Sequence, residues 1–234
     1  MRAAALRNAS LIQDDHLRRI ASWSRHLEPD SFDRARRGIV QKDFSRGDYI
    51  CHRGDKLDAW TGLTSGLVKL STTSRSGKTV TLAGLREGGW FGEGSLLKDE
   101  PRHYDLVALR DSRLAFMNRP TFNWLFENSG AFNRYLVRQF NERLGQFIAL
   151  VEYDRTLDAT ARLARSIAWL FNPVLYPDGG RHLEISQEEI GLLSGLSRPV
   201  TNKSLQVLEA KGLLLVERNG LTVRNLEGLR DFGD

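Results

Sequence analysis

The segment from Ile185 to Val223, ISQEEIGLLSGLSRPVTNKSLQVLEAKGLLLVERNGLTV, decides the fold of this chain. Ser186 followed by Glu189 is a capping-box pattern, in which each side chain binds the other residue's backbone amide at a helix start. Gly195 suits a tight turn, and Ser197 can cap a second helix. The segment therefore predicts two short helices that meet at a steep angle.

The second helix of this segment has two different faces. Pro199 falls in its first turn, where the missing amide costs little. Val200, Leu205 and Leu208 recur at helical spacing, so we expect them to face inward. The residues expected to point outward are Arg198, Thr201, Asn202 and Lys203.

A hairpin pattern follows the two helices. Asn219 and Gly220 lie between Leu213–Glu217 and Leu221–Arg224, and Asn-Gly is the strongest short hairpin signal. Helix, turn, helix and hairpin in one run are typical of a winged helix-turn-helix, which places its second helix in the major groove of DNA. The segment predicts binding to double-stranded DNA; the alternative is a ligand-binding module whose helix-turn-helix serves protein contacts.

Length and composition bound the class of protein. The 234 residues suffice for one large or two ordinary domains. A hydrophobic share of 41% and a charged share of 27% are those of a soluble globular protein. No apolar run approaches the roughly 20 residues that span a bilayer, and charges interrupt the N-terminus too early for a signal peptide. We expect a cytoplasmic protein with no membrane partner.

The cysteine and histidine content argues against metal and redox chemistry. Cys51 is the single cysteine, which excludes an intrachain disulfide and any zinc or iron–sulfur site that needs several thiolates. The five histidines show neither HExxH nor facial-triad spacing. We expect no catalytic residues, no metal site and no enzymatic activity, while a redox role of Cys51 stays open.

The net charge of +5 fits a polyanionic partner. Acidic and basic residues nearly cancel after Thr156, however, and the excess lies upstream, for example at Arg34, Arg36 and Arg37. The local cations of the second helix therefore matter more for DNA binding than the global charge.

The pattern of apolar residues and glycines divides the whole chain into four predicted parts. Residues 1–37 carry amphipathic N-terminal helices, and residues 38–118 alternate short apolar runs with glycine turns, which indicates an antiparallel β barrel or sandwich. Residues 119–154 form a helical connector, and residues 155–234 form the DNA-binding domain after a hinge at Arg155–Thr156.

One long helix is predicted from Ala131 to Asp154. Its apolar residues recur at spacings of three and four, which gives one stripe along the helix. The members of this stripe are Phe132, Leu136, Phe140, Leu144, Phe147 and Val151. The stripe favours association with a partner helix, and the alternative is packing on the chain's own barrel; both can hold at once.

The order of a β-roll, a long helix and a winged helix-turn-helix resembles the Crp/Fnr superfamily of bacterial transcription regulators. Its specific pieces here are SRGDYICHRGD (45–55), GGWFGEGSL (88–96), the long helix and ISQEEIGLLSGLSR (185–198). The resemblance implies an α+β fold with a cyclic-nucleotide-binding-like jelly roll. It also implies a homodimer joined by the long helices, a contact with RNA polymerase, and a small-molecule effector bound in the β-roll.

The resemblance also implies an effector pocket. In members that bind cyclic nucleotides, a Gly-Glu pair is followed by arginine and then serine or threonine; the glutamate binds the ribose, and the other two bind the phosphate. Gly92, Glu93 and Arg102 match this pattern. His103 departs from it, because it replaces the small hydroxyl, and bulky or charged side chains follow it in Tyr104 and Asp105.

The long helix departs from the family pattern too. Its adenine-contacting positions align with Phe147 and Ile148, which cannot bind the base, and each unpaired buried group would cost about 1–3 kcal/mol. Cyclic AMP is therefore not the expected effector. The predicted pocket residues are Gly92, Glu93, Gly94, Ser95, Arg102, His103, Phe147 and Ile148.

Other interpretations of the pocket residues remain open. Gly92 and Glu93 can serve the fold alone, and Arg102 can pair with Asp105 or Glu93. The iron–sulfur branch of the family needs four cysteines, and the haem branch needs an axial histidine. A lone histidine in a barrel is more often structural, so we expect no haem. A regulator that works without any ligand also fits the sequence.

The resemblance places Arg198, Pro199, Asn202 and Lys203 at base-reading positions. Arg198 can bind guanine, Asn202 adenine, and Lys203 guanine or phosphate. Pro199 replaces a glutamate that accepts from cytosine, so we expect a half-site that differs from the family consensus there. Dimer symmetry predicts a palindromic operator. The remaining predicted DNA contacts are Ser186, Gln187, Ser197 and Thr201. Ser186, Gln187 and Ser197 lie near helix starts, so we expect them to contact phosphates.

Overall fold

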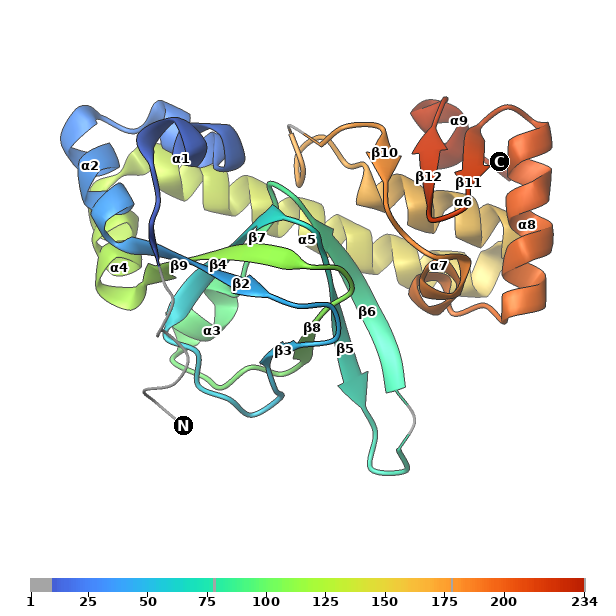
Figure 1. The fold of residues 1–234 in the computed structure, drawn as a ribbon, viewed down its shortest axis with the longest axis horizontal. Coiled ribbons are helices and arrows are strands. Elements are labelled where there is room, and N and C mark those ends of the chain that lie inside the picture. The colour runs from blue at the N-terminus through green and yellow to red at the C-terminus, as the bar shows by residue number, and fades with distance from the viewer. Residues whose placement is uncertain (1–9, 78, 178, 234) are drawn as a thin grey trace.

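The computed structural model describes residues 10–77, 79–177 and 179–233. A β-rich part, the β-roll, lies toward one end, and a small helical part with its own sheet, the DNA unit, lies at the other (Figure 1). Helix α5 (Gly130–Thr156) runs along the length of the molecule and connects them. This is the mixed α+β architecture that the sequence predicts.

Short elements cover the N-terminal end of the described chain. They are β1 (Ser10–Leu11), α1 (Asp14–Ile20), the 3-10 helix η1 (Ser22–His26) and α2 (Pro29–Arg37). The helices follow the prediction, whereas β1 is an addition: it pairs antiparallel with Val40 and Gln41. Two residues are too short to give the alternating pattern from which strands are predicted.

The β-roll consists of two antiparallel sheets, as predicted. Its strands are β2 (Ile39–Phe44), β3 (Tyr49–Cys51), β4 (Ala59–Ser65), β5 (Leu67–Thr73), β6 (Thr79–Arg86), β7 (Trp90–Phe91), β8 (Asp105–Ala108) and β9 (Ser112–Asn118). One sheet has the order β1-β2-β9-β4-β7, and the other has the order β3-β8-β5-β6. Leu63, Leu106 and Leu114 belong to the core of the roll and are fully buried.

A cluster of aromatic side chains joins the N-terminal helices, the β-roll and the start of α5. Trp23 of η1 lies 5.4 Å from Trp60 of β4 and 5.2 Å from Trp90 of β7, between ring centroids. Phe132 of α5 meets Trp60 edge to face at 5.3 Å. Such offset aromatic pairs contribute beyond their buried area, so this cluster fixes where α5 leaves the roll.

Three helices around the roll begin and end close to the predicted residues: α4 (Arg119–Asn128), α5 and α6 (Ala159–Leu170). A fourth helix, α3 (Glu93–Lys98), was not predicted from the sequence. Helix α5 starts one residue earlier and ends two residues later than expected. The predicted hinge at Arg155–Thr156 is wrong, because α5 continues through both residues; Asp158 then caps α6 by accepting from two of its amides.

The DNA unit packs its helices against a three-stranded sheet of order β10-β12-β11. Its elements are β10 (His182–Leu183), α7 (Gln187–Ser194), α8 (Arg198–Ala210), β11 (Leu214–Glu217), β12 (Gly220–Val223) and α9 (Leu226–Arg230). Leu67 and Leu109 of the β-roll belong to the same buried cluster as the helices of this unit. The two ends of the molecule therefore share one apolar core.

Candidate DNA interface and effector site

The capping box at the start of α7 is confirmed. The amide of Glu189 donates to Ser186 Oγ over 3.2 Å, and the amide of Ser186 donates to Glu189 Oε2 over 2.8 Å. Gly195 ends α7 with φ of 67°, in the left-handed region that favours glycine. The two helices therefore meet at the turn that the sequence predicts.

The faces of α8 agree with the prediction in part. Leu205 and Leu208 are buried as expected. Val200 was expected inside but is 38% exposed, and Thr201 was expected outside but is fully buried. Thr201 donates to the Ser197 carbonyl over 3.0 Å, so these two expectations are wrong. The helical spacing of Leu205 and Leu208 predicts their burial, but the first turn of α8 is too short for spacing to show which of its residues face inward.

Thr201 holds the two helices together instead of facing DNA. A Cβ added at Gly191 of α7 would lie 2.7 Å from Thr201 Oγ1. Only glycine lets α7 approach α8 so closely. The position that was assigned to DNA contact thus sets the distance between the helices.

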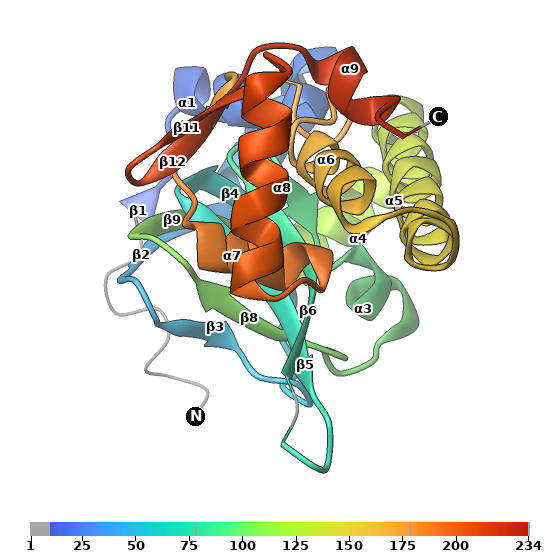
Figure 2. The same ribbon diagram turned by 90° about the vertical axis from the view of Figure 1, so that its right-hand side faces the viewer.

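The first turns of α8 present a cationic and polar face. Arg198, Pro199 and Lys203 are exposed, and Asn202 is half-buried with an Oδ1 that has no hydrogen-bond partner among the described residues. Helix α8 lies at the end of the molecule far from the N-terminal helices (Figure 1), and Figure 2 shows it unobstructed in front of the other elements. Arg198, Pro199 and Lys203 are therefore available to a large partner, whereas the Oδ1 of Asn202 is buried in this conformation.

Three further predicted contacts lie at the starts of α7 and α8. Ser197 precedes α8, but its side chain makes no capping hydrogen bond, which departs from the prediction. Ser186 and Gln187 are half-buried at the start of α7, where Ser186 serves the capping box. The hairpin that follows pairs Glu217 with Gly220, so Arg218 and Asn219 form its turn, one residue earlier than the Asn-Gly pattern suggested.

Arg102 is the centre of the candidate effector site. Its side chain is 1% exposed. Nη2 donates to the carbonyl of Ala59 over 2.9 Å, and Nη1 donates to the hydroxyl of Tyr104 over 3.1 Å. Nε is buried with no partner among the described residues. The alternative that Arg102 pairs with Asp105 or Glu93 is therefore not found within that part of the chain.

Gly92 leaves space for the Arg102 guanidinium because it has no side chain. A Cβ built at Gly92 would lie 1.8 Å from Arg102 Nη1, and the residue has φ of 91°. Glu93 follows in the first turn of α3 and accepts from the Trp60 indole Nε1 over 3.2 Å. Asp105 instead accepts from the Arg53 amide over 2.9 Å. The glutamate and the arginine of the motif thus both bind groups of the protein itself.

Bulky side chains fill the surroundings of Arg102. Burial raises the pKa of Tyr104, and the charge of Arg102 opposes this rise. The phenol is therefore neutral at physiological pH and occupies hydrogen-bonding capacity that a phosphate would use. Trp60 closes the side of Glu93 as a member of the aromatic cluster.

The structure separates the predicted pocket residues into groups. Gly92, Glu93 and Arg102 lie together, and Gly94 and Ser95 continue into the short helix α3. The exposed members are His103, Phe147 and Ile148: His103 pairs with Glu100 at 3.2 Å, and the two α5 residues are 45% and 60% exposed.

The sequence interpretation missed two residues of α5 that face the site. Burial raises the pKa of Tyr135, and the charge of Glu93 adds to this rise, which places both near one another. Arg143 also lies within electrostatic reach of Glu93 and donates to Gln146 Oε1 over 3.2 Å. Polar residues at spacings of three and four, Gln139, Arg143 and Gln146, were the available signal for this second face of α5.

The exposed part of α5 carries an apolar stripe. Its members are Val137, Phe140, Leu144, Phe147, Ile148 and Val151, each at least 38% exposed. Phe132 and Leu136, which the sequence placed in the same stripe, are buried against the roll. The N-terminal part of the predicted stripe is therefore buried in the chain's own core, and the rest is exposed to solvent.

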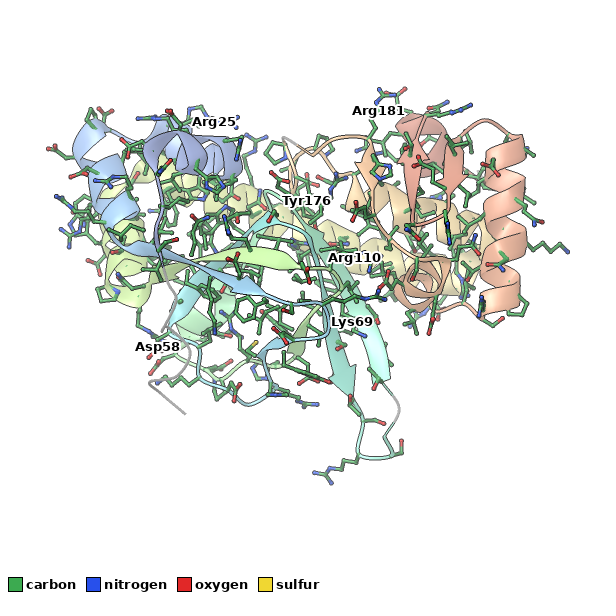
Figure 3. The ribbon with its side chains drawn as sticks, viewed as in Figure 1. Arg25, Asp58, Lys69, Arg110, Tyr176 and Arg181 are labelled. Atoms are coloured by element: carbon green, nitrogen blue, oxygen red, sulfur yellow. The ribbon has the colours of Figure 1, made fainter. Side chains whose placement is uncertain are left out.

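Three contacts join the β-roll to the DNA unit. Arg110 makes a two-pronged ion pair with Glu189, at 2.9 and 2.7 Å, and Tyr176 donates to the Gly84 carbonyl over 3.0 Å (Figure 3). The buried Arg86 of β6 donates to the carbonyls of Leu170, Gly180 and His182. Each contact connects parts of the chain more than 70 residues apart.

Neither a metal cluster nor a membrane helix is found in residues 10–77, 79–177 and 179–233. No three His, Cys, Asp or Glu side chains lie close enough to hold a metal ion there. No helix in the same ranges is long and apolar enough to cross a membrane.

Comparison with known families agrees with this geometry. Residues 41–129 match the model of the cyclic nucleotide-binding domain, and residues 161–232 match that of the Crp-like helix-turn-helix domain. The two modules occur together in transcription regulators of the Crp type.

Individual relatives match over most of their length. The cyclic AMP receptor protein of Thermus thermophilus is 28% identical over 88% of this chain and 94% of its own. A crystal structure of the Thermus thermophilus catabolite activator protein covers 90% of this chain and 98% of its own, at 25% identity and a TM-score of 0.50. The c-di-GMP responsive regulator CLP of Xanthomonas campestris, at 20% identity, covers 84% of this chain and 99% of its own with a TM-score of 0.60.

Proposed function

The chain belongs to the Crp/Fnr family of DNA-binding transcription regulators, and we propose that it reads a palindromic operator as a homodimer without cyclic AMP. Proteins of this family bind DNA as dimers. The observation that carries the proposal is the open first half of α8. Its far side is held in a buried core, while Arg198 and Lys203 face solvent at one end of the molecule.

The chemistry of this face suits base reading. The arginine fork binds the two acceptors of guanine, and an asparagine amide can bind adenine. The exposed guanidinium of Arg198 supplies the first group. The Oδ1 of Asn202 is buried, without a partner among the described residues, so this side chain must rotate to meet adenine. Pro199 has no acceptor for cytosine, so this position of the half-site differs from the usual family consensus.

Dimerisation uses the apolar stripe of α5. Six apolar side chains at helical spacing face solvent on one helix, and such a seam is stabilised when two helices pack along it. A two-fold axis along α5 presents the two α8 helices to half-sites about one helical turn apart.

The β-roll does not receive cyclic AMP in this proposal. Arg102 and Glu93, which would bind the phosphate and the ribose, are held by Ala59, Tyr104 and Trp60. A nucleotide would have to break these bonds inside a buried site, which costs about 1–3 kcal/mol for each group left unpaired. The named relatives respond to different nucleotides, so the shared fold does not fix the effector.

DNA reading is tested by binding-site selection followed by fluorescence anisotropy on the selected duplex. Arg198→Ala is expected to weaken binding by about 1–3 kcal/mol and to relax one base position. Arg230→Ala, an exposed arginine of α9, serves as the control and should bind like the wild type. An unchanged site preference in Arg198→Ala would contradict the base-reading role, and negligible affinity for any duplex at low salt would support a protein-contact role for the motif.

The effector part is tested separately by titration calorimetry. Wild-type protein titrated with cyclic AMP to millimolar concentration is expected to give no binding heat and no change in DNA affinity. Saturable binding with a micromolar Kd would overturn this part and leave the DNA-reading part standing.

A further inference from the structure

A cavity of about 470 Å³ lies apart from the Arg102 site, where η1, α5 and the loop after α6 meet. Its volume is within the range of small-molecule sites in proteins. Pro173, Val174 and Pro177 supply an apolar wall from the loop, and Arg134 and Arg138 line it from α5. Three segments distant in sequence thus build one concave surface.

Among the described residues, the positive charge of the cavity has no counterion. Arg134 and Arg138 are exposed, and neither makes an ion pair or hydrogen bond within the described residues. No carboxylate is among the described residues that line the cavity, and His26 lies at its edge. Like charges four residues apart on a helix repel and destabilise it. An anion bound between Arg134 and Arg138 would reduce this repulsion.

A buried polar group at the cavity wall also lacks a partner. Gln139, 5% exposed, donates through Nε2 to the Val174 carbonyl over 2.9 Å. This bond fixes the orientation of the amide, and its Oε1 is buried and accepts no hydrogen bond from the described residues. That oxygen exposes almost no surface, so the ligand is bound by the arginines and the apolar wall and not by this amide.

We propose that this cavity binds a small organic anion, a carboxylate or a phosphate monoester with an apolar body. The guanidinium groups of Arg134 and Arg138 bind the anionic group, because their planar forks match both anions. The apolar body packs against Pro173 and Val174. The Gln139–Val174 bond connects the floor of the site to the loop that leads into the DNA unit.

Arg138 lies away from the apolar stripe of α5, and Arg134 borders it. At about 100° per residue, Arg138 is about 80° around the helix from Ile148 and about 120° from Leu144, whereas Arg134 is about 40° from Ile148. A partner helix on the stripe therefore leaves Arg138 accessible and runs beside Arg134. The ligand would bind next to the dimer seam.

The test uses the full chain with phenyl phosphate, benzoate and uncharged phenol as probes, followed by thermal shift and titration calorimetry. Both anions are expected to raise the Tm and to bind saturably, and phenol is expected to do neither. The double variant Arg134→Gln with Arg138→Gln should bind at least tenfold more weakly. Its matched control removes two exposed arginines of the DNA unit, Arg218 and Arg230, in the same way.

Each outcome decides the proposal. No binding of either anion, or equal binding by the double variant, overturns it. Equal binding of inorganic phosphate and phenyl phosphate overturns the part that assigns an apolar body. Because the double variant removes charge at exposed positions, circular dichroism with an unchanged spectrum confirms that its weaker binding does not come from unfolding.

Discussion

Gly92 and Gly94 stand two residues apart in one motif but have different roles. Gly92 has φ of 91° and lies against the Arg102 guanidinium, whereas a Cβ at Gly94 would meet nothing within 4 Å. The sequence places both in the effector motif without separating them. What separates them is the position of Arg102, which comes from a loop ten residues later.

Gly92→Ala is expected to destabilise the protein by about 3 kcal/mol, because it combines backbone strain of about 1–3 kcal/mol with a steric overlap. Gly94→Ala, in the first turn of α3, is expected to be neutral or to stabilise by up to about 1 kcal/mol. Urea unfolding monitored by tryptophan fluorescence measures both. Equal effects of the two substitutions would show that Gly92 does not hold Arg102 in place.

The Cys51 thiol is expected to be unreactive in the folded protein. It is 4% exposed, and burial raises its pKa to about 11. The thiolate is the reactive form, so at pH 8 only about one thiol in a thousand is ionised. Reaction with Ellman's reagent should be slow in buffer and fast in urea. Rapid reaction of the folded protein would reopen a redox role for this residue.

Helix α5 shows how far a periodic pattern can carry a prediction at the scale of elements. The spacing of its apolar residues correctly predicts a long helix and one apolar stripe. It cannot tell which part of the stripe is covered by the chain itself, because this depends on where Trp23 and Trp60 meet Phe132. The phase error at Val200 and Thr201 has the same origin, since one turn of helix contains too few residues to fix a face.

Leu144→Glu is expected to dissociate the dimer. Leu144 is 60% exposed in the single chain at the middle of the stripe, and a buried leucine contributes about 1.5–3 kcal/mol, while two glutamates facing across a seam repel. Sedimentation equilibrium should show monomers at micromolar concentration. Glu152→Lys, a charge change beside the stripe on the same helix, is the control and should remain dimeric. A dimeric Leu144→Glu would place the interface elsewhere.

At the scale of the whole molecule, the joint between the β-roll and the DNA unit could not be predicted from sequence. From the local sequence, Arg110 is explained as part of a turn and Glu189 as part of a capping box. Only the fold reveals that Glu189 serves both the cap of α7 and the ion pair across the joint. Pairing between residues 79 positions apart leaves no periodic signal in a single sequence.

The ion pair between Arg110 and Glu189 makes the joint sensitive to pH. Burial by itself would raise the pKa of Glu189, but hydrogen bonds from Arg110 and Ser186 outweigh it and hold the pKa below the ordinary value of 4.5. A depressed pKa stabilises the folded state above the unfolded pKa, and this stabilisation is lost as pH falls through the folded pKa. The joint is therefore expected to be intact at neutral pH and to weaken below about pH 4.5.

Arg110→Gln removes the ion pair and leaves the capping box. It is expected to cost about 2 kcal/mol at pH 7, since both side chains are largely buried, at 19% and 11% exposure. It should also reduce the loss of stability below pH 4.5. Arg113→Gln breaks an equally two-pronged pair with Asp43 that is 50% and 69% exposed, and screening should limit its cost to less than about 1 kcal/mol. Equal costs for the two variants in urea unfolding would mean that this ion pair contributes no more than a surface ion pair, and that the DNA unit is held to the β-roll by the apolar core and the contacts of Tyr176 and Arg86.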